Sequence, residues 1–262
     1  MTLRAGDPYN RGVVTLAAIV LAALVAVPAP GAASDVRAAV DAFVARASGV
    51  SLSSLVIEQD LALYHPDGRR QQSGGEQRVF LRLPRQQRVE QTIDGKREVR
   101  LAVGDRVWVR AADGSVYEAP AATQPRDRTH LLVPFRRSAS DVLAEWRALG
   151  IRDGVSHVTR VGGRPITVIG ALPGDRESPA VWLDAEFGVV RFITREKLPT
   201  GSALMDLAFS EHRLLAGGFF FPYRQEAFVD GKMVVLITVR SIAVNTALPD
   251  ALFDPDALRR GR

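Results

Sequence analysis

The sequence predicts an α+β domain dominated by one large, strongly curved antiparallel sheet of roughly ten strands. From residue 51 onward, apolar and polar residues alternate through most segments, and this period of two is typical of strands that bury one face. Asp-Gly and Gly-Asp pairs separate these segments at short intervals, which indicates hairpins between antiparallel neighbours. Two segments have the period of an amphipathic helix, so helices are expected to cover the sheet.

Residues 1–33 are predicted to be an export signal peptide. Two arginines charge its front, an apolar run of about 13 residues follows at 15–27, and small residues up to Ala33 suit a signal peptidase. Because a helix needs roughly 20 apolar residues to span a bilayer, we expect cleavage near Ala33, with an uncleaved membrane anchor as the alternative. The mature chain, 34–262, is then expected to be a single periplasmic domain.

The composition limits the classes of function. The chain has no cysteine, so burial rather than disulfides must hold the exported domain together. Its formal net charge of +5 is a mild excess, and its arginines are scattered among acids instead of gathered with aromatic residues on one face. Nucleic acid is therefore not an expected partner. Arginines crowd 82–100, which favours either a solvated sheet face or contact with an anionic membrane surface or partner.

The first helix is predicted directly after the signal segment. Ser34 or Asp35 caps its start and Gly49 ends it. Its apolar residues recur at helical spacing and are Val36, Val40, Phe43, Val44 and Ala47. An amphipathic helix of this kind must lie against another surface, which here is the sheet.

The strand from Glu76 to Pro84 has the clearest pattern in the chain. Its pleat places Val79, Leu81 and Leu83 on one face and Arg78, Phe80 and Arg82 on the other. An apolar row opposite cations suits a curved sheet around an apolar interior.

The remaining elements follow from turn signals. Further strands are predicted at 51–63, 88–93, 96–103, 106–110, 155–161, 166–171, 181–184, 189–196, 204–212, 219–229 and 233–242. Residues 120–137 are predicted to be a long loop, because Pro, Thr, Gln and Arg dominate there. A second helix begins at Ser138 or Ser140 and ends at Gly150, and its apolar face consists of Val142, Leu143, Trp146 and Leu149.

The sequence contains no pattern typical of an enzyme or a metal site. The four histidines are far apart, and none belongs to an HExxH motif. A G-x-S-x-G motif is absent, and the Gly-Gly pairs precede strands rather than phosphate-binding helices. Asp184 and Glu186 are two residues apart, but a turn towards Gly188 explains both. We therefore expect no enzymatic activity, no metal and no cofactor.

Several segments resemble the outer-membrane lipoprotein carrier (LolA-like) family in content, order and spacing. They are SLSSLVIEQDLAL at 51–63, RVFLRLP at 78–84 followed by Arg88, VGDRVWV at 103–109, VWLD at 181–184, FPYR at 221–224, and a tail from Asn245 to Phe253-Asp254-Pro255. The set spans most of the mature chain, with a gap at 120–137. The resemblance implies an unclosed β-barrel whose helices form a lid over an apolar cavity for acyl chains. Each exposed CH₂ costs roughly 0.8 kcal/mol, so a carrier must shield its cargo from water.

One position departs from the family pattern. The resemblance implies an inward-pointing arginine before the proline that ends the strand, with hydrogen bonds to the lid. Here Leu83 occupies that position, and the neighbouring Arg82 points outward if the alternation holds. This departure bears on how the lid is held and on which cargo is bound.

The alternation and the resemblance together predict the site. Its apolar lining is expected to be Leu55, Ile57, Leu61, Val79, Leu81, Leu83, Leu101 and Val103, and its lid to include Phe43, Val142 and Trp146. The predicted function is a monomeric periplasmic carrier that binds acyl chains of a lipoprotein or lipid, between an inner-membrane donor and an outer-membrane acceptor. Two alternatives remain: a lipid-sensing regulator of an anti-sigma factor, and an accessory protein of a membrane lipid exporter.

Overall fold

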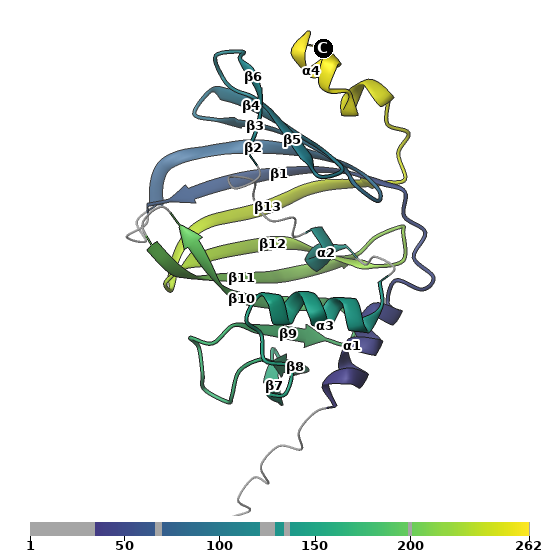
Figure 1. Ribbon diagram of the computed structural model, residues 1–262, viewed down its shortest axis with the longest axis vertical. Helices are drawn as coiled ribbons and strands as arrows, with labels where there is room; N and C mark the ends of the chain where they lie inside the picture. Colours follow the sequence, from purple (N-terminus) through teal and green to yellow (C-terminus); the bar gives the residue numbers. More distant parts are fainter. Residues whose placement is uncertain (1–34, 66–69, 121–128, 134–136, 199–200, 262) are drawn as a thin grey trace, which may run out of the picture. The chain divides into compact units, whose positions relative to one another are not determined.

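One antiparallel sheet of thirteen strands forms the framework of the protein (Figure 1). The computed structural model describes residues 35–65, 70–120, 129–133, 137–198 and 201–261. The predicted signal peptide, 1–33, lies outside the described residues. The sheet is not closed, because β6 and β7 stand at its two ends with a single strand neighbour each. This arrangement confirms the predicted fold class.

The elements are as follows. The strands are β1 (Ser54–Tyr64), β2 (Arg70–Arg82), β3 (Gln86–Ile93), β4 (Lys96–Val103), β5 (Arg106–Arg110), β6 (Val116–Glu118), β7 (Ser156–Val161), β8 (Arg164–Ile169), β9 (Ala180–Asp184), β10 (Gly188–Leu198), β11 (Gly201–Leu214), β12 (Phe220–Val229) and β13 (Lys232–Val244). The helices are α1 (Val36–Ala45), α2 (Thr129–Leu132), α3 (Ala139–Ala148) and α4 (Pro255–Arg259), with a 3₁₀ helix, η2, at Asp250–Phe253.

The strand order joins two meanders at the middle of the sheet. Strands β1 to β6 pair in succession towards one end, and β7 to β13 pair in succession from the other. The two runs meet where β13 pairs with β1, so that Leu55 lies between Val244 on β13 and Leu81 on β2. The first and last strands of the chain therefore form the centre of the sheet, and the cavity described below depends on this long-range pairing.

Both predicted helices begin at the residues that the capping pattern indicates. The Asp35 side chain accepts a hydrogen bond from the amide of Ala38 at 3.2 Å, and Ser138 accepts one from Asp141 at 3.1 Å. Gly150 follows α3 with a φ of 85°, a conformation that favours glycine. These predictions are confirmed.

Thirteen strands exceed the roughly ten predicted. The segment that the pattern did not reveal is β6, whose three residues are too few to show alternation. The predicted loop at 120–137 contains α2, whose four residues make little more than one helical turn. Neither η2 nor α4 was predicted, although Pro255 after the capping residue Asp254 is a recognisable helix start.

The sheet has two faces, each covered by different segments. We call the face under α1, α2 and α3 the inner face and the opposite one the outer face (Figure 1). On the inner face, Trp146 of α3 packs in one cluster with Val181 of β9 and Phe192 of β10. On the outer face, the C-terminal segment packs Phe253 and Leu258 in a cluster with Phe80, Leu101 and Trp108.

Candidate functional site

A cavity of about 800 Å³ lies on the inner face. Its walls come from β1 to β5 and β11 to β13, and Leu132 of α2 and the adjoining Val133 also line it. Most of its apolar lining consists of Ile57, Val79, Leu81, Leu83, Val89, Val107, Leu207, Phe209, Phe221, Val235 and Ile237. Arg85 and Asp105 line it as well, and because their side chains are 70% and 88% exposed, the cavity reaches solvent at this end. Its volume falls within the roughly 300–1,000 Å³ typical of ligand pockets.

The structure brings four of the predicted lining residues to this cavity: Ile57, Val79, Leu81 and Leu83. Leu55 faces the same side and is fully buried in the adjoining core with Leu81 and Phe221, beside the cavity rather than in its wall. Leu61 is in phase with Leu55 and Ile57 along β1 and is also buried outside the lining.

Leu101 and Val103 lie on the outer face, which corrects the prediction that they line the cavity. On β4 the residues that line the cavity are Arg100 and Ala102. Leu101 is fully buried beneath the C-terminal segment, and Val103 packs against the same cluster. The prediction chose the wrong face because the apolar face of β4 packs beneath η2 and α4, two elements that were not predicted.

The predicted lid residues cover another part of the inner face. Phe43 of α1 and Trp146 of α3 have ring centroids 5.9 Å apart, and both pack with Val142 above β8 to β11. None of the three lines the cavity. Instead Leu132 and Val133 cover it, at a place where sequence reasoning expected only a loop.

Leu83 lines the cavity, whereas its neighbour Arg82 points to the outer face, as the alternation predicts. The Arg82 guanidinium donates to the carboxylate of Asp250 at 2.8 Å and to the carbonyl of Leu248, and it lies 4.6 Å from the ring centre of Phe253. An arginine therefore fastens the C-terminal segment to β2, and the cavity side of this strand end stays apolar.

A polar row crosses the floor of the cavity, and sequence reasoning missed it. Gln59, Gln77, Gln91 and Glu98 lie directly opposite one another on β1, β2, β3 and β4, and we call them the glutamine row. The successive donor–acceptor distances are 2.6, 3.1 and 3.3 Å, and Arg100 donates to Glu98 at 2.7 Å. All three glutamines and Arg100 line the cavity. The alternation could have revealed the row, because Gln59 is in phase with Ile57, and Gln77 with Val79.

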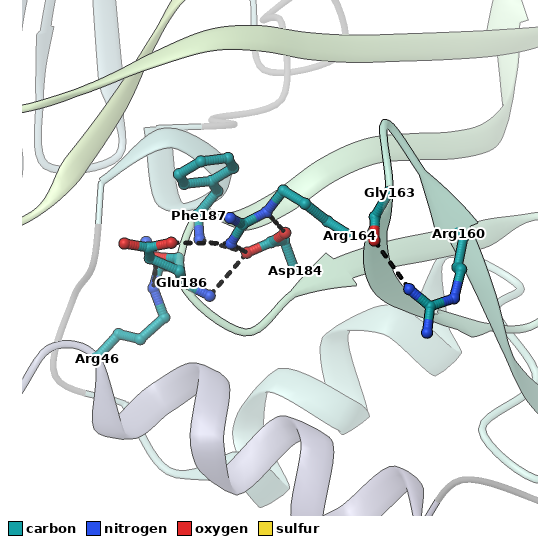
Figure 2. Close-up of polar contacts among 7 residues, drawn as sticks. All are labelled: Arg46, Arg160, Gly163, Arg164, Asp184, Glu186 and Phe187. Atoms are coloured by element: carbon teal, nitrogen blue, oxygen red, sulfur yellow. Dashed lines mark hydrogen bonds and ion pairs between the residues drawn. The ribbon is translucent and has the colours of Figure 1, made fainter.

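A charged cluster at the β9–β10 turn holds α1 in place, as Figure 2 shows. Arg46, which follows α1, donates to the carbonyl of Glu186 at 3.1 Å. Arg164 donates to both oxygens of Asp184, at 2.6 and 2.9 Å, and to Glu186 at 2.8 Å. Burial raises the pKa of Asp184, but the hydrogen bonds from Arg164 and from the amides of Phe187 and Glu186 outweigh it and hold that pKa below its ordinary value. The Asp184 carboxylate is thus charged, and its hydrogen bonds stabilise the β9–β10 turn to which Arg46 donates.

His212 lies beside this cluster. Its ring stacks on Phe187 with centroids 4.6 Å apart, and within the described part of the chain its Nε2 atom is buried without a hydrogen-bond partner. Burial, aided by the charges of Arg46 and Arg164, lowers the pKa of His212 to about 4 against the opposing charge of Asp184. The imidazole is therefore neutral at neutral pH.

The described residues contain neither a candidate metal site nor a helix that could span a membrane. Within them, no group of three or more histidines and carboxylates is placed to hold a metal ion. None of the helices in these same residues combines the length and the apolar character needed to cross a membrane.

The sequence matches no family model and no curated protein. Solved structures do match. A domain named as an outer membrane lipoprotein-sorting protein from Vibrio parahaemolyticus aligns over 86% of this chain and 98% of its own, with a TM-score of 0.52 and 13% identity. A DUF1329 family protein from Desulfovibrio piger aligns over 85% and 98%, with a TM-score of 0.52 and 14% identity.

A LolA superfamily protein from Nitrosomonas europaea aligns over 83% of this chain and 98% of its own, with a TM-score of 0.51 and 12% identity. At such identities the likeness establishes the fold alone. It confirms the fold that the sequence resemblance implied.

Proposed function

We propose that this protein is an exported, non-enzymatic carrier that holds the acyl chains of a lipoprotein or lipid in the inner-face cavity while the cargo crosses the periplasm towards the outer membrane. It works as a monomer, receives cargo from an inner-membrane donor and releases it to an outer-membrane acceptor. The observation that carries the proposal is the cavity of about 800 Å³, walled largely by aliphatic and aromatic side chains and open to solvent at Arg85 and Asp105.

The physical requirement for a carrier is a shielded apolar volume. Each CH₂ that leaves water contributes about 0.8 kcal/mol, so a chain of about 16 carbons would gain on the order of 12 kcal/mol if it were fully enclosed. Among the described residues, Leu132 and Val133 roof part of the cavity, and a partly roofed cavity encloses a chain less completely and so permits release. The shared fold with proteins named for lipoprotein sorting and for the LolA superfamily supports the same role.

The test begins with the exported chain purified without detergent. Its organic-solvent extract is analysed by mass spectrometry, and the emptied protein is titrated with a fluorescent acyl probe. We expect co-purified acyl lipids and saturable probe binding. A protein that is reproducibly free of lipid and takes up no acyl probe would contradict the proposal.

A matched pair of substitutions assigns the binding to the cavity. Ala102 lines the cavity on β4, and Ala62 lies on the outer face of β1, out of phase with Leu61. Ala102→Trp should fill part of the volume and weaken probe binding about tenfold, a change of about 1.4 kcal/mol. Ala62→Trp adds the same side chain outside the cavity and should leave the affinity unchanged.

A further inference from the structure

The glutamine row gives the cavity a polar floor that an apolar chain by itself does not require. Glu98 as a carboxylate only accepts hydrogen bonds, so Gln91 must donate to it through Nε2. The carbonyl oxygen of Gln91 then accepts from Gln77, whose oxygen accepts from Gln59. One charged residue thereby sets the direction of every amide in the row.

The row does not use the full hydrogen-bonding capacity of these amides. Each glutamine carries two N–H groups and an oxygen with two lone pairs. The row takes one N–H of each glutamine and one lone pair each of Gln77 and Gln91. Because these side chains line the cavity, a bound molecule would meet amide groups with donors and acceptors that the row leaves unused. An alkyl chain that covered them would remove water and supply no replacement bond, which costs free energy.

The surroundings of the row indicate the kind of group that would satisfy it. Arg100 donates to Glu98 at 2.7 Å, so the pair carries no net charge and an anionic group is not required for balance. Apolar wall lies on both sides of the row: Ile57 and Val79 towards the β2–β3 turn, and Ile237 and Val235 in the other direction along the strands. A ligand with a neutral polar linkage between apolar segments would match this arrangement, in which a polar row lies between two apolar stretches of wall.

We propose that the glutamine row binds the ester-linked glycerol of an acylated ligand, so that the cavity selects acylglycerol-type amphiphiles over molecules that are apolar throughout. The inference rests on the proposed function, because it assigns the polar part of the same ligand. The ester carbonyls accept from the glutamine amides, and in a ligand that keeps a free glycerol hydroxyl this group also donates to a glutamine oxygen. A free glycerolipid and the thioether-linked glyceride of a lipoprotein share the ester carbonyls, which are the contacts that the proposal requires.

The experiment compares two classes of ligand on the full exported chain. N-phenyl-1-naphthylamine reports the apolar volume by direct fluorescence titration, and two competitors with equal acyl chains are tested, dipalmitoylglycerol and a dipalmitoylglyceryl-cysteine peptide. Gln77→Leu should weaken the glycerides about tenfold, equivalent to about 1.4 kcal/mol, and change the affinity for the apolar probe less than twofold. Which of the two competitors binds more tightly to the wild type distinguishes a glycerolipid from a lipoprotein source.

Gln87→Leu is the matched control. Gln87 also lines the cavity on β3 but stands opposite Leu81 and Ala102, outside the row, so the same exchange there should leave the ratio of the two affinities unchanged. Gln91→Leu serves as the second variant if Gln77→Leu does not fold. Each variant is also unfolded thermally.

The outcomes separate the two proposals. Unchanged glyceride affinity in both row variants, or an equal loss for glycerides and apolar probe, overturns the role of the row. A lowered melting temperature with an unchanged affinity ratio likewise overturns it, because it identifies the row as structural. A wild-type protein that binds neither class of ligand contradicts the proposed function itself.

Discussion

Arg82 Nη1 lies 2.8 Å from Asp250 Oδ1, and this contact joins β2 to the C-terminal η2 on the outer face. The adjoining residue, Leu83, lines the cavity on the inner face. Two adjacent residues at the end of β2 thus point to opposite faces and have different roles. Arg82 binds the C-terminal segment, and Leu83 belongs to the candidate binding site.

Arg82→Ala should lower the free energy of unfolding by about 1–2 kcal/mol. Asp250 is 99% exposed, so the ion pair contributes little by itself, whereas the contact with the Phe253 ring and the bond to the Leu248 carbonyl add about 0.5–1 kcal/mol each. Asp250→Ala should therefore cost less than about 0.5 kcal/mol. Urea unfolding followed by tryptophan fluorescence measures both, and equal losses would contradict this assignment.

Leu83→Arg should weaken binding of an acyl probe by at least about tenfold, because it places an unpaired charge in the cavity wall. Leu83→Met keeps the apolar volume and is the control, with an expected change below about twofold. Fluorescence titration at neutral pH measures both variants. Unchanged affinity in Leu83→Arg would show that acyl chains do not reach this end of the cavity.

Acid should destabilise the protein through His212. Its pKa is about 4 in the folded state and about 6.5 in the unfolded chain, so above pH 6.5 neither form is charged and the residue adds no pH dependence. As the pH falls from 6.5 to 4, the unfolded chain takes up a proton that the folded protein excludes, and stability falls by up to roughly 2 kcal/mol, since the ring is partly exposed.

His212→Phe should remove this contribution while retaining the stacking on Phe187. Urea unfolding at pH 7.5 and pH 5 measures the change. The variant should lose less stability between the two pH values than the wild type, and equal losses would exclude His212 as the source.

Gly188→Ala should release α1 from the sheet. A Cβ atom there would lie 1.7 Å from Arg46 Nη1, and φ at Gly188 is 86°. Gly231 has a similar φ of 76° and nothing within 4 Å of such a Cβ, so Gly231→Ala reports the backbone strain alone, about 1 kcal/mol. We expect Gly188→Ala to cost about 1 kcal/mol more, because Arg46 loses its bond to the Glu186 carbonyl.

Hydrogen exchange distinguishes the two glycine variants further. Amides of α1 should exchange faster in Gly188→Ala than in Gly231→Ala, since only the first displaces Arg46. Arg46→Ala should reproduce the faster exchange. Identical exchange in all three proteins would show that Arg46 does not hold the helix.

The part of the site that could be predicted consists of residues whose direction follows from the alternation within a single strand. Ile57, Val79, Leu81 and Leu83 line the cavity on the face that the alternation indicates, because each alternates with a polar or outward residue on its own strand. Leu101 was placed on the wrong face, because β4 carries apolar residues on the side that the C-terminal segment covers. Alternation shows which residues of a strand share a face, but it does not show which helix or segment packs against that face.

Turn chemistry, capping and the period of two act over a few residues, so the antiparallel strands, the starts of α1 and α3 and the inward direction of Leu83 can be predicted from the sequence, whereas α1 ends at Ala45 and not at Gly49. Three features become visible only in the folded protein: β13 pairs with β1, α2 rather than α3 covers the cavity, and three glutamines and Glu98 form one row. These features depend on contacts between residues distant in the sequence, and no local pattern encodes which strand becomes the neighbour of another.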